Sequence, residues 1–394
     1  MNSPSPSLSR RSLIKGSIAA AAGLTIPLWK AFGLPAAAAD EELVPFLNMP
    51  RTPPNRLDWE MLKDWLTPQE QVFSVQHYNV PEIDPAKFSL EVTGSVERPV
   101  RLTLAQIKSR PKKDQLMTLE CSGNGQNAGF MNAVYNSRWT GTPLVPLLRE
   151  CGVKPESLEV VFFGADKADE TLRPGTKREL KIDVPFGRSR SLDDAMSQNL
   201  LLAYERNGQP LDKRNGAPLR LIVPGWYGVA NVKWLNRIQI QNRRYMGRFM
   251  GRDYVSVRAE RRGDEIVNVE SSVTRMRLKS VIGRVTRRPA QSGQVPLRAI
   301  GAAWGDGTAI TKVEVQVDGG PWRPAVLDAK PNEKFCWRFF AIDLGTLAAG
   351  KHTLVSRAID ASGRVQPSAQ DDEIALKKTY YEANQQWVRE IEIA

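Results

Sequence analysis

The sequence changes in character near residue 277, and this change limits the possible folds more than any other feature of the chain. Beyond it, short segments rich in β-branched and aromatic residues recur at near-regular spacing, separated by Gly, Pro and Asp. Residues 318–320, Asp-Gly-Gly, form a hairpin signal between two of these segments. Short strands with regular turns are typical of a β-sandwich, so we predict an all-β, immunoglobulin-like domain over residues 273–394.

The upstream part, residues 40–272, mixes helix and strand signals without a regular strand–helix–strand rhythm. Thr103 is a candidate N-cap, Gly152 follows a short apolar helix, and a further short helix is expected around residues 57–66. The chain has 394 residues, too many for one compact core. We therefore predict an α+β domain followed by the sandwich. The sequence contains no GxGxxG dinucleotide fingerprint.

The first 39 residues have the pattern of an export signal. Arg10 and Arg11 lie in Ser-Arg-Arg-Ser-Leu-Ile-Lys, ahead of a modestly apolar stretch and an alanine run. We interpret residues 1–39 as a twin-arginine signal peptide, cleaved near Ala39, which predicts a periplasmic protein. The alternatives are an ordinary secretory signal or a short membrane anchor, although Lys30 interrupts the apolar stretch.

The charge pattern gives no indication of nucleic-acid binding. The net charge is +12, and four of the basic residues lie in the first 39 positions, which hold no acid, so +8 remains for the rest. Lys and Arg are scattered among acidic residues, with no long basic block. We expect a solvated basic surface, with a docking face for an acidic protein as the alternative.

The three cysteines differ in their surroundings. Cys151 and Cys336 lie in apolar segments and are expected to be small buried residues, whereas Cys121 opens a loop of small residues, CSGNG. The sequence has two histidines and no CxxC, CxxCH, GxSxG or P-loop motif, so multi-histidine metal sites and covalently attached haem are excluded. A single thiolate suits a metal whose other soft ligands come from a cofactor.

Several ordered blocks resemble the sulfite oxidase family of molybdenum-cofactor enzymes. They cover roughly residues 70–390 and read QHYNVPEIDPAKFSLEVTG, TLECSGNG, NSRWTGTPLVPLLRECGV, NGAPLRLIVPGWYGVANVKWLNRI, GRDYVSVR and VEVQVDGGPWRPAVL. The resemblance implies a molybdenum-cofactor domain over residues 40–272 and a dimerisation domain over residues 273–394, and hence a homodimer. It also implies molybdenum–molybdopterin as the cofactor.

The same resemblance assigns roles to individual residues. Cys121 would be the thiolate ligand of molybdenum, and Tyr254 would line the substrate pocket beside it. Arg220 and Lys233 would hold the pyrophosphate of the pterin, since cationic donors suit a phosphate. The remaining predicted cofactor-binding residues are Gln76, His77, Asn215 and Asn231.

Two departures from the family pattern concern the substrate. Val75 stands where the family usually has an arginine that faces an anion, and Gln126 replaces an arginine five residues after the cysteine. A desolvated dianion needs paired charge, so affinity for sulfite should be poor unless another arginine takes over. The candidates for that replacement are Arg138, Arg248 and Arg252.

The resemblance implies oxygen-atom transfer, with sulfite oxidation to sulfate as the first expectation. Without a haem motif in this chain, electrons would pass to an external acceptor such as a c-type cytochrome. The second expectation is oxidation or reduction of a neutral sulfur or nitrogen compound, for example a sulfoxide. The third is a binding protein that kept the fold without the cofactor.

Overall fold

The protein is described by a computed structural model. It describes residues 41–49, 52–53, 55–62, 64–127, 130–197, 199–288, 295–328 and 333–394. The predicted signal peptide lies outside these residues. None of the helices within them has the length and apolar character needed to cross a bilayer.

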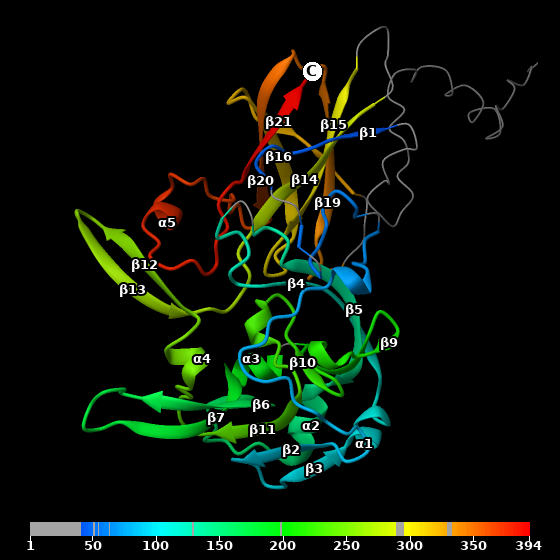
Figure 1. Cartoon of the computed structure of the whole chain (residues 1–394). Helices are drawn as coiled ribbons and strands as arrows, with labels where there is room; N and C mark the ends of the chain where they lie inside the picture. Colours follow the sequence, from blue (N-terminus) through cyan, green and yellow to red (C-terminus); the bar gives the residue numbers. More distant parts are fainter. Residues whose placement is uncertain are drawn as a thin grey trace, which may run out of the picture.

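Two sheets, one antiparallel and one mixed, form the upstream domain, which is the lower part of the molecule in Figure 1. One sheet has the order β10-β8-β5-β4, with β9 beside β8, and the other has the order β3-β2-β11-β6-β7. The strands of the first sheet are β4 (Lys113–Glu120), β5 (Val134–Pro143), β8 (Leu201–Arg206), β9 (Gln209–Pro210) and β10 (Arg220–Ile222). Those of the second are β2 (Ser89–Gly94), β3 (Val100–Thr103), β6 (Glu159–Leu172), β7 (Leu180–Ser191) and β11 (Leu235–Gln241).

The helices within the described residues are short. Thr103 caps α1 with a capping box that Gln106 completes, and Gly152 ends α2 with a φ of +67°, as their residue types predict. The α-helices are α1 (Leu104–Lys108), α2 (Leu144–Cys151), α3 (Leu192–Ser197), α4 (Arg248–Gly251) and α5 (Asp372–Ala375). The 3-10 helices are η1 (Gln69–Gln71), η2 (Lys213–Asn215) and η3 (Gly228–Ala230).

The helix expected around residues 57–66 is not formed. The described residues of this stretch make turns and bends instead. Trp59 explains the difference, because its Nε1 donates to the Met131 carbonyl over 2.9 Å and its ring stacks on Trp304 at 5.9 Å. These distant partners outweigh local helix propensity.

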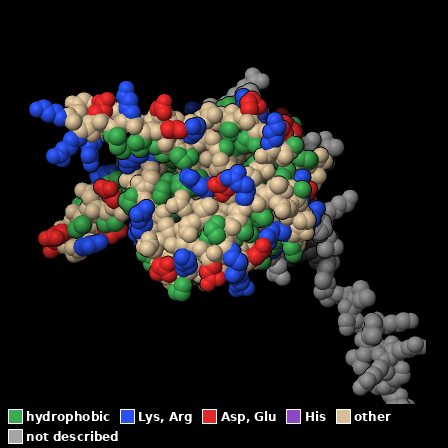
Figure 2. Space-filling model, turned by 90° about the horizontal axis from the view of Figure 1, so that it is seen from below, with side chains coloured by type: hydrophobic (Ala, Val, Ile, Leu, Met, Phe, Trp, Pro, Cys, Tyr) green, Lys and Arg blue, Asp and Glu red, His purple; other side chains and the backbone are tan. Residues whose placement is uncertain are grey.

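Two long hairpins project from the same side of the molecule (Figure 1). One is β6–β7, and the other is β12 (Val255–Arg262) with β13 (Glu265–Ser272). Figure 2 shows them as two arms, with basic and acidic side chains intermingled over the face between and around them. No continuous basic surface covers this face.

The C-terminal domain is a sandwich of two antiparallel sheets, in agreement with the predicted all-β fold. The orders are β1-β14-β15-β19-β18 and β17-β16-β20-β21. Asp318 and Gly319 both have positive φ, as a two-residue hairpin turn requires. The strands are β1 (Glu42–Val44), β14 (Lys279–Arg287), β15 (Leu297–Trp304), β16 (Ile310–Val317), β17 (Arg323–Pro324), β18 (Val326–Leu327), β19 (Arg338–Gly345), β20 (Gly350–Asp360) and β21 (Val388–Ile393).

The two domains share more than a linker. Strand β1, from the start of the described chain, pairs with β14 and so extends a sheet of the C-terminal domain. One buried apolar cluster also crosses the junction, since it contains Leu57 and Leu90 together with Trp304 and Trp337. The predicted boundary near residue 273 remains a prediction, but the contacts across it are extensive.

Candidate active site

A single cavity brings together all the residues to which the sequence resemblance gave a role. Strands and loops far apart in the chain converge on it, and Phe73, Val75, Leu119 and Val229 add apolar wall. The predicted residues that line it are Gln76, His77, Cys121, Asn215, Arg220, Asn231, Lys233 and Tyr254. Their convergence supports one shared site, while the role of each remains a prediction.

Cys121 lies in this wall directly after the end of β4. Its backbone N–H donates to the Ala133 carbonyl over 2.9 Å, and its carbonyl accepts the N–H of Asn124 at 2.9 Å. Burial raises the pKa of the thiol, and a hydrogen bond from the Gly123 backbone partly opposes this rise. The free chain therefore holds a protonated thiol at neutral pH, and a bound cation would favour the thiolate.

Tyr254 and His77 form a hydrogen-bonded pair on the cavity wall. The Tyr254 hydroxyl lies 2.5 Å from Nε2 of His77. Burial and the Lys233 charge lower the pKa of His77 to about 4, and burial raises the pKa of Tyr254. Both groups are thus neutral at neutral pH. Tyr254 has a φ of +58°, an uncommon conformation for a bulky residue, and Tyr381 stacks on its ring at 4.9 Å.

Two cations, Arg220 and Lys233, also line the cavity, and Nζ of Lys233 lies 3.3 Å from the Ser74 hydroxyl, beside Val75. Arg220 is buried, and its two terminal nitrogens each donate over 3.0 Å, one to the carbonyl of Asn215 and one to that of Asn231. Its Nε has no hydrogen-bond partner among the described residues. Nζ of Lys233 donates to the Arg214 carbonyl over 2.9 Å, and burial together with the Arg220 charge lowers the pKa of Lys233 to about 7. Neither cation has a carboxylate within ion-pair distance in the part of the chain that the structure describes.

The predicted amides are largely engaged with the protein itself. Asn231 accepts the Val223 N–H at 2.7 Å and donates to the Tyr227 carbonyl over 3.1 Å. Asn215 donates to Asp212, and Gln76 donates to Ser74. The side chain of Asn231 therefore orders its own loop, and the backbone carbonyl of Asn231 accepts from Arg220. Asn231 thus contributes to the site indirectly.

Asp166 lines the cavity although the sequence reasoning did not select it. The pairing of β6 with β7 is irregular between Phe163 and Lys167, and Asp166 lies within that irregularity. Burial raises its pKa to about 6, and its Oδ1 has no hydrogen-bond partner in the described ranges. The available signal was a carboxylate at the end of the apolar run VVFFGAD, which also fits an ordinary strand end.

The two residues that depart from the family pattern, Val75 and Gln126, lie in different places. Val75 lines the cavity, as expected, but Gln126 is exposed and does not. None of the three replacement arginines lines it either. Arg138 is exposed on β5, while Arg248 and Arg252 make ion pairs with Glu170 at 3.2 and 2.7 Å.

Comparison with known families and structures gives matches along most of the chain. The model described as "Oxidoreductase molybdopterin binding domain" matches residues 77–249, and "Mo-co oxidoreductase dimerisation domain" matches residues 266–384. The crystal structure of "the Sulfane Dehydrogenase SoxCD from Paracoccus pantotrophus" superposes with a TM-score of 0.71 at 26% identity, covering 99% of this chain and all of that one.

Curated relatives include two sulfite oxidases and a nitrate reductase. Sulfite oxidase of Gallus gallus is 30% identical over 330 residues, which cover 77% of this chain and 69% of that protein. Mitochondrial sulfite oxidase of Rattus norvegicus is 30% identical, and the match spans 78% of this chain but 58% of that protein. Nitrate reductase [NADH] 1 of Arabidopsis thaliana is 32% identical, and the match spans 36% of its length.

Proposed function

Because the chain belongs to the sulfite oxidase family of molybdenum-cofactor oxidoreductases, we propose that it oxidises a sulfur compound without compact dianionic charge, such as sulfane sulfur. Overall, water provides one oxygen atom, the sulfur loses two electrons, and two protons are released. The two electrons go to an external acceptor. Three residues that line the cavity, Val75, His77 and Tyr254, carry this proposal, because each of them is neutral.

The residues present fit the family's cofactor. A soft thiol, two cations without a carboxylate partner and a buried guanidinium Nε without a hydrogen bond suit a group that carries both a metal and phosphate. In this proposal Cys121 is the metal ligand, and Arg220 and Lys233 hold the phosphate end. Asn215, Gln76 and His77 complete the cavity around the group. When bound, the cofactor supplies oxygen-atom transfer coupled to a two-electron change.

The residues proposed to face the substrate form a neutral, hydrogen-bonding part of the cavity wall. The Tyr254 hydroxyl keeps its proton at neutral pH and can donate to an oxygen on the substrate. In the tautomer in which Nε2 of His77 donates to that hydroxyl, the Tyr254 proton stays free for the substrate and the hydroxyl is held in place. Phe73, Val75 and Leu119 exclude water without adding charge.

Sulfite is the second candidate. The sulfite oxidases of rat and chicken favour it, since they match most of this chain. The neutral wall speaks against it, because a small dianion removed from water needs paired charge. The structure named sulfane dehydrogenase SoxCD supports the sulfane candidate, and its match covers 99% of this chain.

A substrate panel tests the proposal. Purified protein with its molybdenum content measured is assayed with a persulfide, with sulfite and, using a reduced dye, with a sulfoxide. We expect the persulfide to give the highest kcat/KM, and a higher value for sulfite would overturn the substrate assignment. Cys121→Ser should abolish turnover and the thiolate-to-molybdenum absorption band, whereas the control Cys151→Ser should keep both.

We also propose that the protein is exported, that it passes electrons to an external partner and that it forms a dimer. Replacing Arg10 and Arg11 by lysine should leave the protein in the cytoplasm, as fractionation would show. A c-type cytochrome should serve as electron acceptor, and failure of several to be reduced would reject this class of partner. The matched dimerisation domain predicts a homodimer, to be measured by light scattering.

A further inference from the structure

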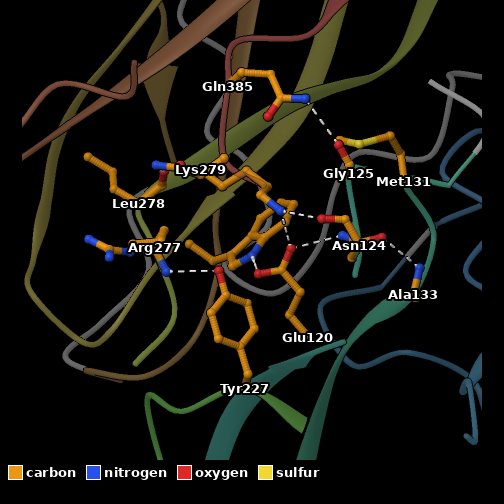
Figure 3. Close-up of polar contacts among 12 residues, drawn as sticks. Glu120, Asn124, Gly125, Met131, Ala133, Tyr227, Arg277, Leu278, Lys279 and Gln385 are labelled. Atoms are coloured by element: carbon orange, nitrogen blue, oxygen red, sulfur yellow. Dashed lines mark hydrogen bonds and ion pairs between the residues drawn. The ribbon is translucent and has the colours of Figure 1, made fainter. Parts of the chain in front are cut away.

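A buried ion pair between the two domains lies immediately behind the Cys121 loop. Glu120 is the last residue of β4, directly before the cysteine, and Lys279 is the first residue of β14 in the C-terminal domain. Their side chains are fully buried, and Nζ of Lys279 lies 2.5 Å from Oε1 of Glu120. Figure 3 shows the two side chains pointing toward each other with Asn124 beside them.

The remaining hydrogen bonds of this pair connect it to Asn124 of the loop and to Trp304 of β15. Nζ of Lys279 also donates to the Asn124 carbonyl over 2.8 Å, and the Asn124 amide donates to Glu120 over 2.9 Å. Oε2 of Glu120 accepts Nε1 of Trp304 at 2.9 Å. Asn124 in turn accepts the Ala133 N–H at 3.0 Å. Lys279 thus bridges residues 120 and 124, the two ends of the segment that carries the thiol.

Other residues of the C-terminal domain contact the same loop. The Glu382 N–H donates to the Ser122 carbonyl over 2.7 Å, and the Gln385 amide donates to the Gly125 carbonyl over 3.1 Å. A Cβ on Gly125 would lie 3.2 Å from Nζ of Lys279, and one on Gly123 would lie 3.3 Å from the ring of Tyr380. The small residues of the loop therefore permit this close approach.

Stability alone is a weak reason for such a pair. A buried ion pair often stabilises a protein no more than well-packed apolar residues of the same volume, because both charges lose their hydration. The geometry offers a better reason, since, among the described residues, every side-chain hydrogen bond of Lys279 ends on Glu120 or Asn124. We propose that Lys279 is a positioning residue, which fixes the Cys121 loop from the C-terminal domain. This inference rests on the proposed role of Cys121.

Hydrogen–deuterium exchange of the cofactor-free protein tests the inference without requiring turnover. Lys279→Met should speed exchange of the amides of residues 121–126 about tenfold, while β2 and β11 exchange as in the wild type. The control is Arg389→Met, which removes another buried cation of the same domain, one that donates to the Ile282 carbonyl. It should leave the 121–126 amides unchanged.

The milder Glu120→Gln keeps the shape of the pair and carries the same test if Lys279→Met does not fold. We expect about threefold faster exchange in residues 121–126, because the charge attraction and the bond from Trp304 are lost, while the amide oxygen can still accept from Lys279 and Asn124. Unchanged exchange in this segment, or an equal rise in β2 and β11, would overturn the inference.

A spectroscopic readout separates this inference from the proposed function. In the cofactor-loaded Glu120→Gln variant, the thiolate-to-molybdenum absorption band should shift or broaden relative to the wild type. An identical band would overturn the positioning role. If the wild type has no such band, Cys121 is not the metal ligand, and the exchange measurement still decides whether Lys279 orders the loop.

Discussion

Two sets of residues that line the cavity differ in charge. Arg220 and Lys233 form a cationic set, whereas Val75, His77 and Tyr254 form a neutral set. The residues proposed to hold a phosphate can thus carry charge, and those proposed to face the substrate do not. In this interpretation, the cationic set determines whether the cofactor is retained and the neutral set determines which sulfur compound reacts.

The largest effect should come from removing a charge from the cationic set. Arg220→Met should weaken retention of the cofactor about 1,000-fold, since charge-assisted hydrogen bonds to a phosphate are lost from a buried site. Molybdenum analysis of the purified variant measures this. Arg206→Met is the matched control, because Arg206 is also buried but does not line the cavity. Equal molybdenum loss in both variants would contradict the assignment.

Lys233 should make the stability of the cofactor-free protein depend on pH. Its pKa is about 7 in the folded chain against 10.5 in the unfolded chain, so the unfolded chain binds more protons between these values. The free energy of unfolding should therefore rise by about 3 kcal/mol from pH 7 to 10.5, allowing for partial solvent screening.

Urea denaturation of the wild type and of Lys233→Met across this pH range isolates the contribution. The variant should lack most of the rise. Bound cofactor should also reduce it, because a nearby phosphate favours the charged ammonium. An identical pH dependence in the wild type and the variant would show that Lys233 does not titrate there.

The neutral set is tested by the conservative substitution Tyr254→Phe. The ring and its stacking on Tyr381 remain, and only the hydroxyl is lost. We expect kcat to fall about 30-fold with little change in KM, the scale of one hydrogen bond to a developing charge. Normal molybdenum content would show that the cationic set still holds the cofactor. A pure KM effect would instead assign the hydroxyl to ground-state binding.

The smallest expected effect comes from adding a charge to the neutral set. Val75→Arg places a cation in the neutral wall and should improve kcat/KM for sulfite about tenfold, while the persulfide loses activity. Val75→Met adds length without charge and should not improve sulfite oxidation. Equal behaviour of the two variants would mean that bulk, and not charge, selects the substrate.

Local signals in the sequence predicted much of the fold. Thr103 and Gly152 mark helix ends through their own backbone and side-chain preferences, and the turn at Asp318 follows from its residue types. Such features need only neighbouring residues. The helix expected around Trp59 failed because that ring stacks on Trp304, more than 200 positions away.

The residues of the site likewise fall into those that local sequence patterns reveal and those that depend on distant contacts. Motif resemblance located the cavity residues, including Cys121 and Arg220, because their segments carry distinctive patterns. Asp166 and Lys279 could not be found in this manner. Asp166 depends on an irregularity in strand pairing, and Lys279 depends on two domains meeting. Neither the irregular pairing nor the domain contact produces a repeating pattern of residue types in the sequence.

Strand β1 makes the cofactor domain an insertion within the sandwich. The chain lays down Glu42–Val44 first, but the partner strand β14 follows more than 230 positions later. During synthesis from the N-terminus, this edge of the sheet must wait until the intervening domain has been made. Because β14 also begins with Lys279, closing the sheet and ordering the thiol loop become one event. A truncated chain would thus lack both a finished sandwich and a finished site.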